Sequence, residues 1–193
     1  MRHFIAFLFL IVLCACSAPP SSYKHVSGKG LPKAAADRDP VRRIVMTYDK
    51  AHEKIDVVYF HDGHYDASAM RKIENIMRDR HNGFRGSIDP ELVDYMVDLR
   101  KRMGLPASIP FQILSGYRSP ETNGKLSKNN SNVAKESHHL RGWAVDFRIK
   151  NVDGRAIAEI AKTMQRGGVA YYPSDNHLHV DIGNIRTWQD KNR

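Results

Sequence analysis

The chain has 193 residues, a formal net charge of +9, 41% hydrophobic residues and 9% aromatic residues. This length accommodates one domain and a tail, and the apolar content is too high for a disordered chain. The positive charge favours an anionic partner, but the basic residues are scattered and carry no interleaved aromatics, which argues against nucleic acid and leaves a membrane surface or an acidic cell-wall polymer.

Residues 1–15 have the pattern of a signal peptide. A short basic start precedes an apolar run from Phe4 to Ala15, which falls short of the roughly 20 residues that span a bilayer. The segment Leu13–Cys16 resembles the bacterial lipobox, in which cleavage exposes a cysteine that is then lipidated. The resemblance implies lipidation of Cys16, with plain secretion or an uncleaved anchor as the alternatives. Ser17 in the next position implies a periplasmic protein tethered to the outer membrane.

The two cysteines of the chain both lie in this N-terminal region. Cys14 leaves with the signal and Cys16 carries the lipid, so the exported domain has no thiol for a disulfide or a metal. Any metal must then be held by histidines and carboxylates. Residues 16–40 are rich in Pro, Ser, Gly and Ala and predict a flexible tether after the lipidated cysteine. The folded domain is expected over residues 41–193.

The first half of this domain predicts one hairpin and two helices. Arg42–Phe60 holds two β-rich runs around a polar turn. Asp66–Gly83 and Ser87–Gly104 each show helical spacing of apolar residues and end on glycine. In the second of them, Asp89 is a good N-cap and Pro90 suits the first helical position.

The second half predicts mainly strands. Ile109–Ser119 is a strand that runs into a turn, and Gly142–Ile149 alternates apolar and polar residues. Asp153–Gly168 predicts a helix, and Gly168–Pro173 and His177–Gly183 predict two more strands. Because the helices come first and most strands follow, the order favours an α+β fold with a central antiparallel sheet.

One predicted strand carries three titratable side chains on the same face, namely those of His177, His179 and Asp181. Such a face is either exposed to solvent or part of a site, because burying these groups without partners is costly. Asp146 lies on the polar side of its own strand. If the two strands are neighbours, His139, Asp146 and His179 converge as the open three-ligand set of a catalytic zinc. An exposed His-x-His strand remains the alternative at this point.

These residues also carry a resemblance to a known family. Ser137–Asp146 fits the pattern Ser-x-His-x-x-Gly-x-Ala-x-Asp, and His-x-His follows about thirty residues later. Together with the Tyr-Arg-Ser turn in Ser115–Asn123, this resembles the M15 zinc peptidases, which share a fold with D-Ala-D-Ala peptidases and the hedgehog signalling domain. The stretch Arg43–Trp188 is similar to the murein endopeptidase K subgroup. The resemblance implies an α+β sheet with helices packed on one side.

The resemblance implies that His139, Asp146 and His179 bind one Zn²⁺ per chain. It also implies that Arg118 steadies the oxyanion or a substrate carboxylate, a role that suits a fixed planar guanidinium.

The general base is less well defined by the resemblance. Many members of the family place Glu or Asp three residues before the last ligand, where this chain has Asn176. His177 is then the favoured base or transition-state donor, with Asp181 and Asp175 as the other candidates. Asp181 is a catalytic candidate mainly as a partner that orients a histidine.

The resulting prediction is a zinc metallopeptidase that hydrolyses the peptide cross-links of peptidoglycan during cell-wall remodelling. Its expected partners are peptidoglycan stem peptides, contacted by Tyr117 and Ser137, and the membrane through the N-terminal lipid; no nucleic acid is expected. Two alternatives remain: a D,D- or L,D-carboxypeptidase acting on stem peptides, and a non-catalytic zinc-bearing lipoprotein that binds the wall. Asn176 is the feature that favours the non-catalytic alternative.

Overall fold

A computed structural model describes residues 39–130 and 133–189. The predicted signal peptide, Cys16 and most of the tether lie outside the described residues. No helix within the described ranges has the length and apolar character needed to cross a membrane.

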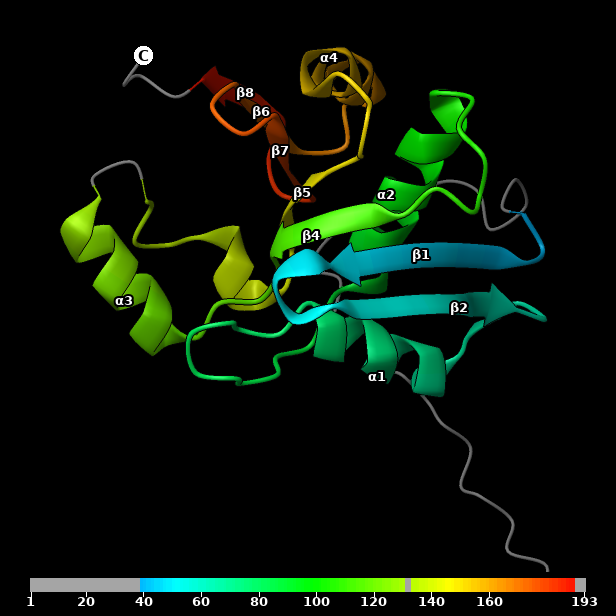
Figure 1. Ribbon diagram of the computed structural model, residues 1–193, viewed down its shortest axis with the longest axis horizontal. Coiled ribbons are helices and arrows are strands. Elements are labelled where there is room, and N and C mark those ends of the chain that lie inside the picture. The colour runs from blue at the N-terminus through cyan, green and yellow to red at the C-terminus, as the bar shows by residue number, and fades with distance from the viewer. Residues whose placement is uncertain (1–38, 131–132, 190–193) are drawn as a thin grey trace, which may run out of the picture.

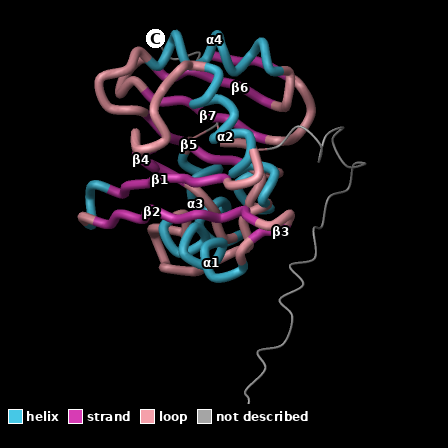
Figure 2. Tube along the Cα trace, turned by 90° about the vertical axis from the view of Figure 1, so that its right-hand side faces the viewer, coloured by secondary structure: helices cyan, strands magenta, loops and turns pink. Residues whose placement is uncertain are grey.

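The described chain folds around one sheet of eight strands in the order β3-β2-β1-β4-β5-β7-β6-β8 (Figures 1 and 2). The strands are β1 (Arg42–Tyr48), β2 (Glu53–His61), β3 (His64–Tyr65), β4 (Phe111–Ser115), β5 (Ala144–Arg148), β6 (Gly168–Tyr172), β7 (His177–Asp181) and β8 (Arg186–Gln189). The helices are α1 (Ala67–Ile76), α2 (Pro90–Arg102), α3 (Pro120–Asn129) and α4 (Gly154–Met164). Two short 3-10 helices cover Asp49–Ala51 and His138–Arg141.

The predicted α+β class is confirmed, and the sheet is mixed rather than wholly antiparallel. β1 pairs with β4 in parallel, and β6 pairs with β8 in parallel, while the other neighbouring strands are antiparallel. In each parallel pair the later strand joins the sheet after other elements have formed. These are β2, β3, α1 and α2 between β1 and β4, and β7 between β6 and β8.

Helices α1, α2 and α4 pack on the sheet and share a single hydrophobic core with it. Figure 2 places α1 beside β2 at one end of the sheet and α4 beside β6 at the other. Local signals explain where these helices begin: Asp66, Asp89 and Asp153 each cap one of them by accepting a backbone N–H bond. Pro90 takes the first position of α2, as predicted.

The two faces of the sheet have different roles. Val145 and Val180 are directly paired on β5 and β7, and both are buried in the core. Side chains alternate along a strand, so the residue next to each of these valines points to the other face. There Asp146 is paired with His179. The register of β5 and β7 therefore places the polar residues together on the face away from the core.

Candidate metal centre

Three side chains from three segments meet on this second face. His139 Nε2 lies 3.3 Å from His179 Nδ1 and 3.3 Å from Asp146 Oδ1, and the distance from His179 Nδ1 to Asp146 Oδ1 is 2.8 Å. A tetrahedral zinc with bonds of about 2.0–2.1 Å holds neighbouring ligand atoms about 3.3 Å apart. These are the three residues of the described chain whose donor atoms cluster closely enough to hold a metal ion. The expected ligand atoms therefore lie together: two of the three distances match that spacing, and the third, from His179 Nδ1 to Asp146 Oδ1, is shorter.

Each histidine is held so that one nitrogen is left for a metal. His139 Nδ1 donates to the carbonyl oxygen of Gly116 at 2.6 Å, which leaves the lone pair on Nε2. His179 lies between two carboxylate oxygens, with Asp181 Oδ2 3.0 Å from Nε2 and Asp146 Oδ1 2.8 Å from Nδ1; a bond donated from Nε2 to Asp181 would leave the lone pair on Nδ1 for a metal. Hydrogen bonds of this kind fix the tautomer and the ring orientation of metal-binding histidines. The free lone pairs belong to the two nitrogens that face Asp146.

The backbone around His139 positions its ring. Ser137 caps the short 3-10 helix that carries His139, and Gly142 ends that helix at a φ of +66°. A Cβ at Gly142 would lie 1.9 Å from the Ser87 carbonyl oxygen, so only glycine fits there without a backbone shift. Arg118 N–H donates to the His139 carbonyl at 3.1 Å, which ties the Tyr-Arg-Ser turn to the same helix.

The charges of the centre suit a cation. Burial disfavours a charged Asp146, but the neighbouring His139 and His179 outweigh it and hold the pKa of that carboxyl well below its usual range. Burial is the main cause that lowers the pKa of His139, which keeps its ring neutral. Burial acts the same way on His179, but Asp146 and Asp181 raise its pKa above the usual value. An ionised carboxylate and a neutral imidazole are the forms that bind zinc, so Asp146 and His139 are already in the binding form, whereas zinc would displace the proton that the raised pKa favours on His179.

Arg118 lies directly beside the ligands. Its terminal nitrogen donates to Asp146 Oδ2 at 2.7 Å, and its Nε donates to Ser115 Oγ at 3.0 Å. The ligand atom of Asp146 is the other oxygen, Oδ1, so Arg118 and the two histidines engage opposite sides of one carboxylate.

A cleft of about 370 Å³ opens above the three ligands. Arg118, Ser137 and His177 line it, as expected for residues that contact a substrate or transfer a proton. His177 stacks flat on Tyr172 with 4.4 Å between ring centroids, and its Nδ1 lies 2.5 Å from Asp175 Oδ1. The side chain of His177 is 18% exposed, so it is accessible from the cleft.

Asn176, which stands where many relatives have an acid, has a structural role. Its Oδ1 accepts from Gly154 N–H at 2.8 Å, and its Nδ2 donates to the Val152 carbonyl at 2.9 Å. Asn176 also has a φ of +53°, a conformation that asparagine tolerates better than most residues. Its side chain thus supports the start of α4 and does not line the cleft.

Asp181 lies behind His179, with no exposed surface. Its oxygens accept from His179, from Gly168 N–H at 3.0 Å and from Gly183 N–H at 2.8 Å. Of the two interpretations from sequence, the geometry favours the partner that orients a histidine over a group that reaches the substrate.

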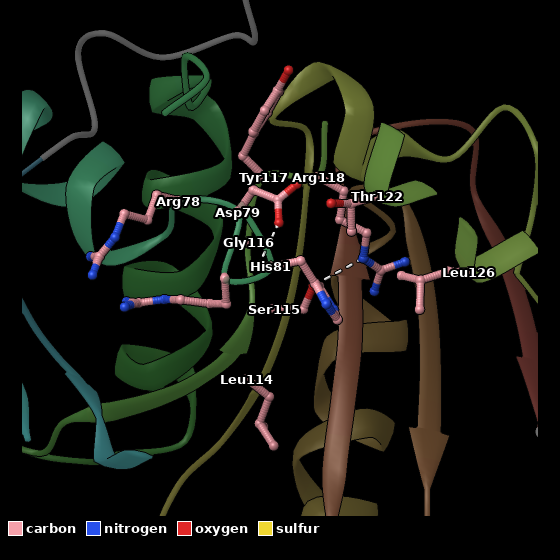
Figure 3. Close-up of a pocket in the computed structure, with 11 residues that line it drawn as sticks. Arg78, Asp79, His81, Leu114, Ser115, Gly116, Tyr117, Arg118, Thr122 and Leu126 are labelled. Carbon is pink, nitrogen blue, oxygen red and sulfur yellow. Dashed lines mark hydrogen bonds between the residues drawn. The ribbon is translucent and has the colours of Figure 1, made fainter. Parts of the chain in front are cut away.

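Tyr117 and Arg118 are among the residues that line a second cavity, of about 190 Å³ (Figure 3). The ring of Tyr117 lies 6.0 Å from that of Phe84, whose side chain is largely exposed. Arg118 lines both cavities, so a ligand in the second cavity would lie next to the metal centre.

Several further cleft residues were not identified from the sequence, among them Tyr172, Arg186 and Trp188. Trp188 lies with its ring 5.0 Å from that of His179, and Arg186 bonds to Asp181. The spacing of Arg186 and Trp188, two residues apart after the His-x-His strand, was the available signal.

Comparisons with known proteins identify the family of the chain. A family model described as peptidoglycan L,D-endopeptidase MepK matches residues 35–188. A peptidoglycan L,D-endopeptidase MepK of Escherichia coli is 36% identical over 146 residues, which cover 75% of this chain and 79% of the relative. A probable peptidoglycan L,D-endopeptidase MepK of Haemophilus influenzae is 34% identical over 125 residues, covering 65% of this chain and 67% of the relative.

The match places the chain among the M15 peptidases, as the motifs predicted, and its sheet with helices packed on it is consistent with that class. Within that class, the chain belongs to the MepK family.

Proposed function

We propose that this protein is a zinc-dependent L,D-endopeptidase that hydrolyses the peptide cross-links of peptidoglycan. The spacing of His139 Nε2, Asp146 Oδ1 and His179 Nδ1 is the observation that carries the zinc site. The names of the two relatives support the substrate and the bond, which joins an L-centre carbonyl to a D-centre amine.

The chain's own residues have distinct tasks in this proposal. Zinc held by three protein ligands supplies a Lewis acid that polarises a carbonyl and activates water near neutral pH. Arg118 stabilises the negative charge that develops on the carbonyl oxygen; its bonds to Ser115 and Asp146 fix the guanidinium plane and leave further N–H groups to donate. His177 moves the proton from water to the leaving amine.

The remaining residues act on the substrate or on the ligands. Asp181 orients His179 and holds the proton on its Nε2. Ser137 lies at the edge of the cleft and contacts the stem peptide, and Tyr117 contacts the part of the substrate that enters the second cavity.

The cellular setting is also part of the proposal. The signal sequence over residues 1–15 directs the protein to the periplasm, and a lipid on Cys16 tethers it to the outer membrane. Residues 16–40 then give the peptidase domain of residues 41–193 its reach into the wall. The net charge of +9 suits a polymer rich in carboxylates.

The test is digestion of purified murein by the zinc-loaded chain from residue 17 onward, followed by liquid chromatography and mass spectrometry of the muropeptides. The expected result is loss of 3-3 cross-linked dimers with matching growth of monomers. His139→Ala should abolish this loss and the zinc binding. His64→Ala, which removes an exposed histidine outside the cluster, is the matched control and should retain both.

Other outcomes would assign a different function. Shortened monomers with intact dimers would indicate a carboxypeptidase, and loss of 4-3 dimers would indicate a different bond. Intact muropeptides with zinc shown to be bound would indicate a wall-binding protein.

A further inference from the structure

β8 is a four-residue strand at the edge of the sheet that the proposed function leaves without a role. It pairs in parallel with β6, so that Arg186 lies beside Gly168 and Trp188 beside Ala170. Arg186 and Trp188 are two residues apart and therefore project from the same face of the strand. Ala170 is in turn paired with His179, so this is the face that carries the metal centre.

Arg186 reaches a metal ligand through one buried carboxylate. Its two terminal nitrogens donate to Asp181, at 2.7 Å to Oδ2 and at 3.1 Å to Oδ1. Asp181 is fully buried, and its Oδ2 is also the acceptor for His179 Nε2. A buried carboxylate without a charged partner is costly, so Arg186 both neutralises Asp181 and fixes the plane in which it meets His179.

Trp188 reaches the proposed proton carrier through one phenol. Its Nε1 donates to the Tyr172 hydroxyl at 3.3 Å. Tyr172 stacks on His177 with 4.4 Å between centroids and 3° between the ring planes. The Arg186 guanidinium lies over the Trp188 ring at 4.8 Å, which connects the two residues to each other.

We infer that β8 supplies two positioning residues for the active site: Arg186 sets the metal ligand His179 through Asp181, and Trp188 sets His177 through Tyr172. The second half rests on the proposed function, since it takes His177 as the proton carrier. Trp188 also has its ring 5.0 Å from that of His179, a contact that an aromatic replacement keeps, so the two residues act on different properties when a ring is retained at position 188. Arg186 governs how tightly the metal is held, and Trp188 governs turnover once the metal is bound.

The first test measures zinc affinity by competition with a chromophoric chelator on the purified protein. Arg186→Gln should weaken zinc binding about 10- to 100-fold, the usual effect of removing a residue that orients a ligand. Arg186→Lys keeps the charge but not the bidentate hydrogen bond, so its zinc affinity should lie between those of Arg186→Gln and the wild type. The matched control is Arg155→Gln, which removes an exposed arginine that lies over the Tyr171 ring. An affinity for Arg186→Gln within twofold of the control would overturn the role of Arg186.

The second test separates Trp188 from the metal. Trp188→Phe and Tyr172→Phe each remove the N–H···O bond and keep an aromatic ring. Each variant should bind zinc as wild type does and show a several-fold lower kcat with little change in KM. Because both changes break the same bond, the double variant should be no slower than the slower single variant. Additive losses, or an unchanged kcat, would overturn the role of Trp188.

A readout without activity distinguishes failure of this inference from failure of the proposed function. The stacked Tyr172 ring shifts the NMR signals of the His177 ring protons. These signals are assigned as the ones that disappear in His177→Gln. Trp188→Phe should move these signals, and Arg155→Gln should leave them in place. If murein is untouched by wild type while zinc affinity and these signals respond as described, the endopeptidase fails and the positioning roles stand.

Discussion

Asp79→Asn should remove a measurable part of the stability of the domain. Asp79 is 1% exposed, and its two oxygens accept from His81 N–H at 2.9 Å and from Ser119 N–H at 2.8 Å. Burial raises the pKa of this carboxyl, but the bonds from Thr122, Ser119 and His81 outweigh it and lower the pKa from 3.8 to about 2. At 1.36 kcal/mol per pKa unit, the ionised form contributes about 2 kcal/mol to the free energy of unfolding.

The direction of the pH dependence follows from the lowered pKa. The folded state binds a proton more weakly than the unfolded state, so the contribution is complete above the unfolded pKa of 3.8 and is lost as the pH falls through about 2. Urea unfolding followed by circular dichroism at pH 7, 5, 3 and 2, with a chelator in every sample, measures it. The variant should be about 2 kcal/mol less stable at pH 7 and 5, and the difference should shrink at pH 3 and again at pH 2.

Two results would refute this reasoning: a difference under about 0.5 kcal/mol at pH 7, or a larger difference that does not change with pH. Asp56→Asn is the control, since that exposed carboxylate pairs with the exposed Arg43 on the neighbouring strand; its effect should be much smaller. Because Ser119 directly follows Arg118, Asp79→Asn should also reduce peptidase activity at pH 7, where the control should not.

Further predictions concern turnover and the backbone. Arg118→Lys should lower kcat about 100-fold with zinc still bound, because a lysine cannot bond Ser115 and Asp146 while donating to an oxyanion; an unchanged kcat would exclude Arg118 from the reaction. His177→Gln should lower kcat about 10²- to 10⁴-fold, again with zinc retained, as measured by murein digestion and metal analysis; loss of the metal would instead make His177 a structural residue. Gly142→Ala should lower the melting temperature and weaken zinc binding, because its Cβ meets a backbone oxygen and its φ is positive; a wild-type melting curve would contradict this.

The parts of the fold that could be predicted are those where local sequence signals and tertiary packing agree. The cap at Asp89, the proline at Pro90 and the apolar stripe that follows all indicate α2, and the alternation around Phe147 indicates β5. Helix α3 was not predicted, because it begins on a good cap, Ser119, but has no apolar stripe; its buried residues are Thr122 and Asn123. The α1 helix was expected to continue towards Gly83 and ends at Ile76, since the following residues form the loop that Asp79 anchors.

Strand order was the least predictable feature. Alternation shows which residues share a face, but it does not show which strand lies beside which. β4 pairs with β1 in parallel although two helices lie between them in the chain, and this long-range contact has no local signal.

The cluster at the candidate site was predictable because a motif and a periodicity pointed to the same three residues. His139, Asp146 and His179 each lay in a matched pattern, and strand parity placed two of them on one face. The partners of these residues were harder to predict, because they act through bonds that depend on the tertiary fold. The group that fixes His139 is the backbone carbonyl of Gly116, which no side-chain pattern reveals. Arg186 lies on a strand of four residues, whose one signal was the two-residue spacing to Trp188.

The balance of charge around the centre explains why these partners matter. Asp146 is paired with Arg118, and Asp181 is paired with Arg186, so two carboxylates and two guanidinium groups leave the protein part of the site formally neutral when the histidines are neutral. A dication in this setting keeps a larger share of its charge than it would among several thiolates or unpaired carboxylates. That charge favours an anionic group in the cleft, whether a substrate carboxylate or the oxygen of a reacting carbonyl. In the proposed function Arg118 would therefore have two effects: it would reduce the negative charge on Asp146, and it would add a donor on the side where the substrate's negative charge develops.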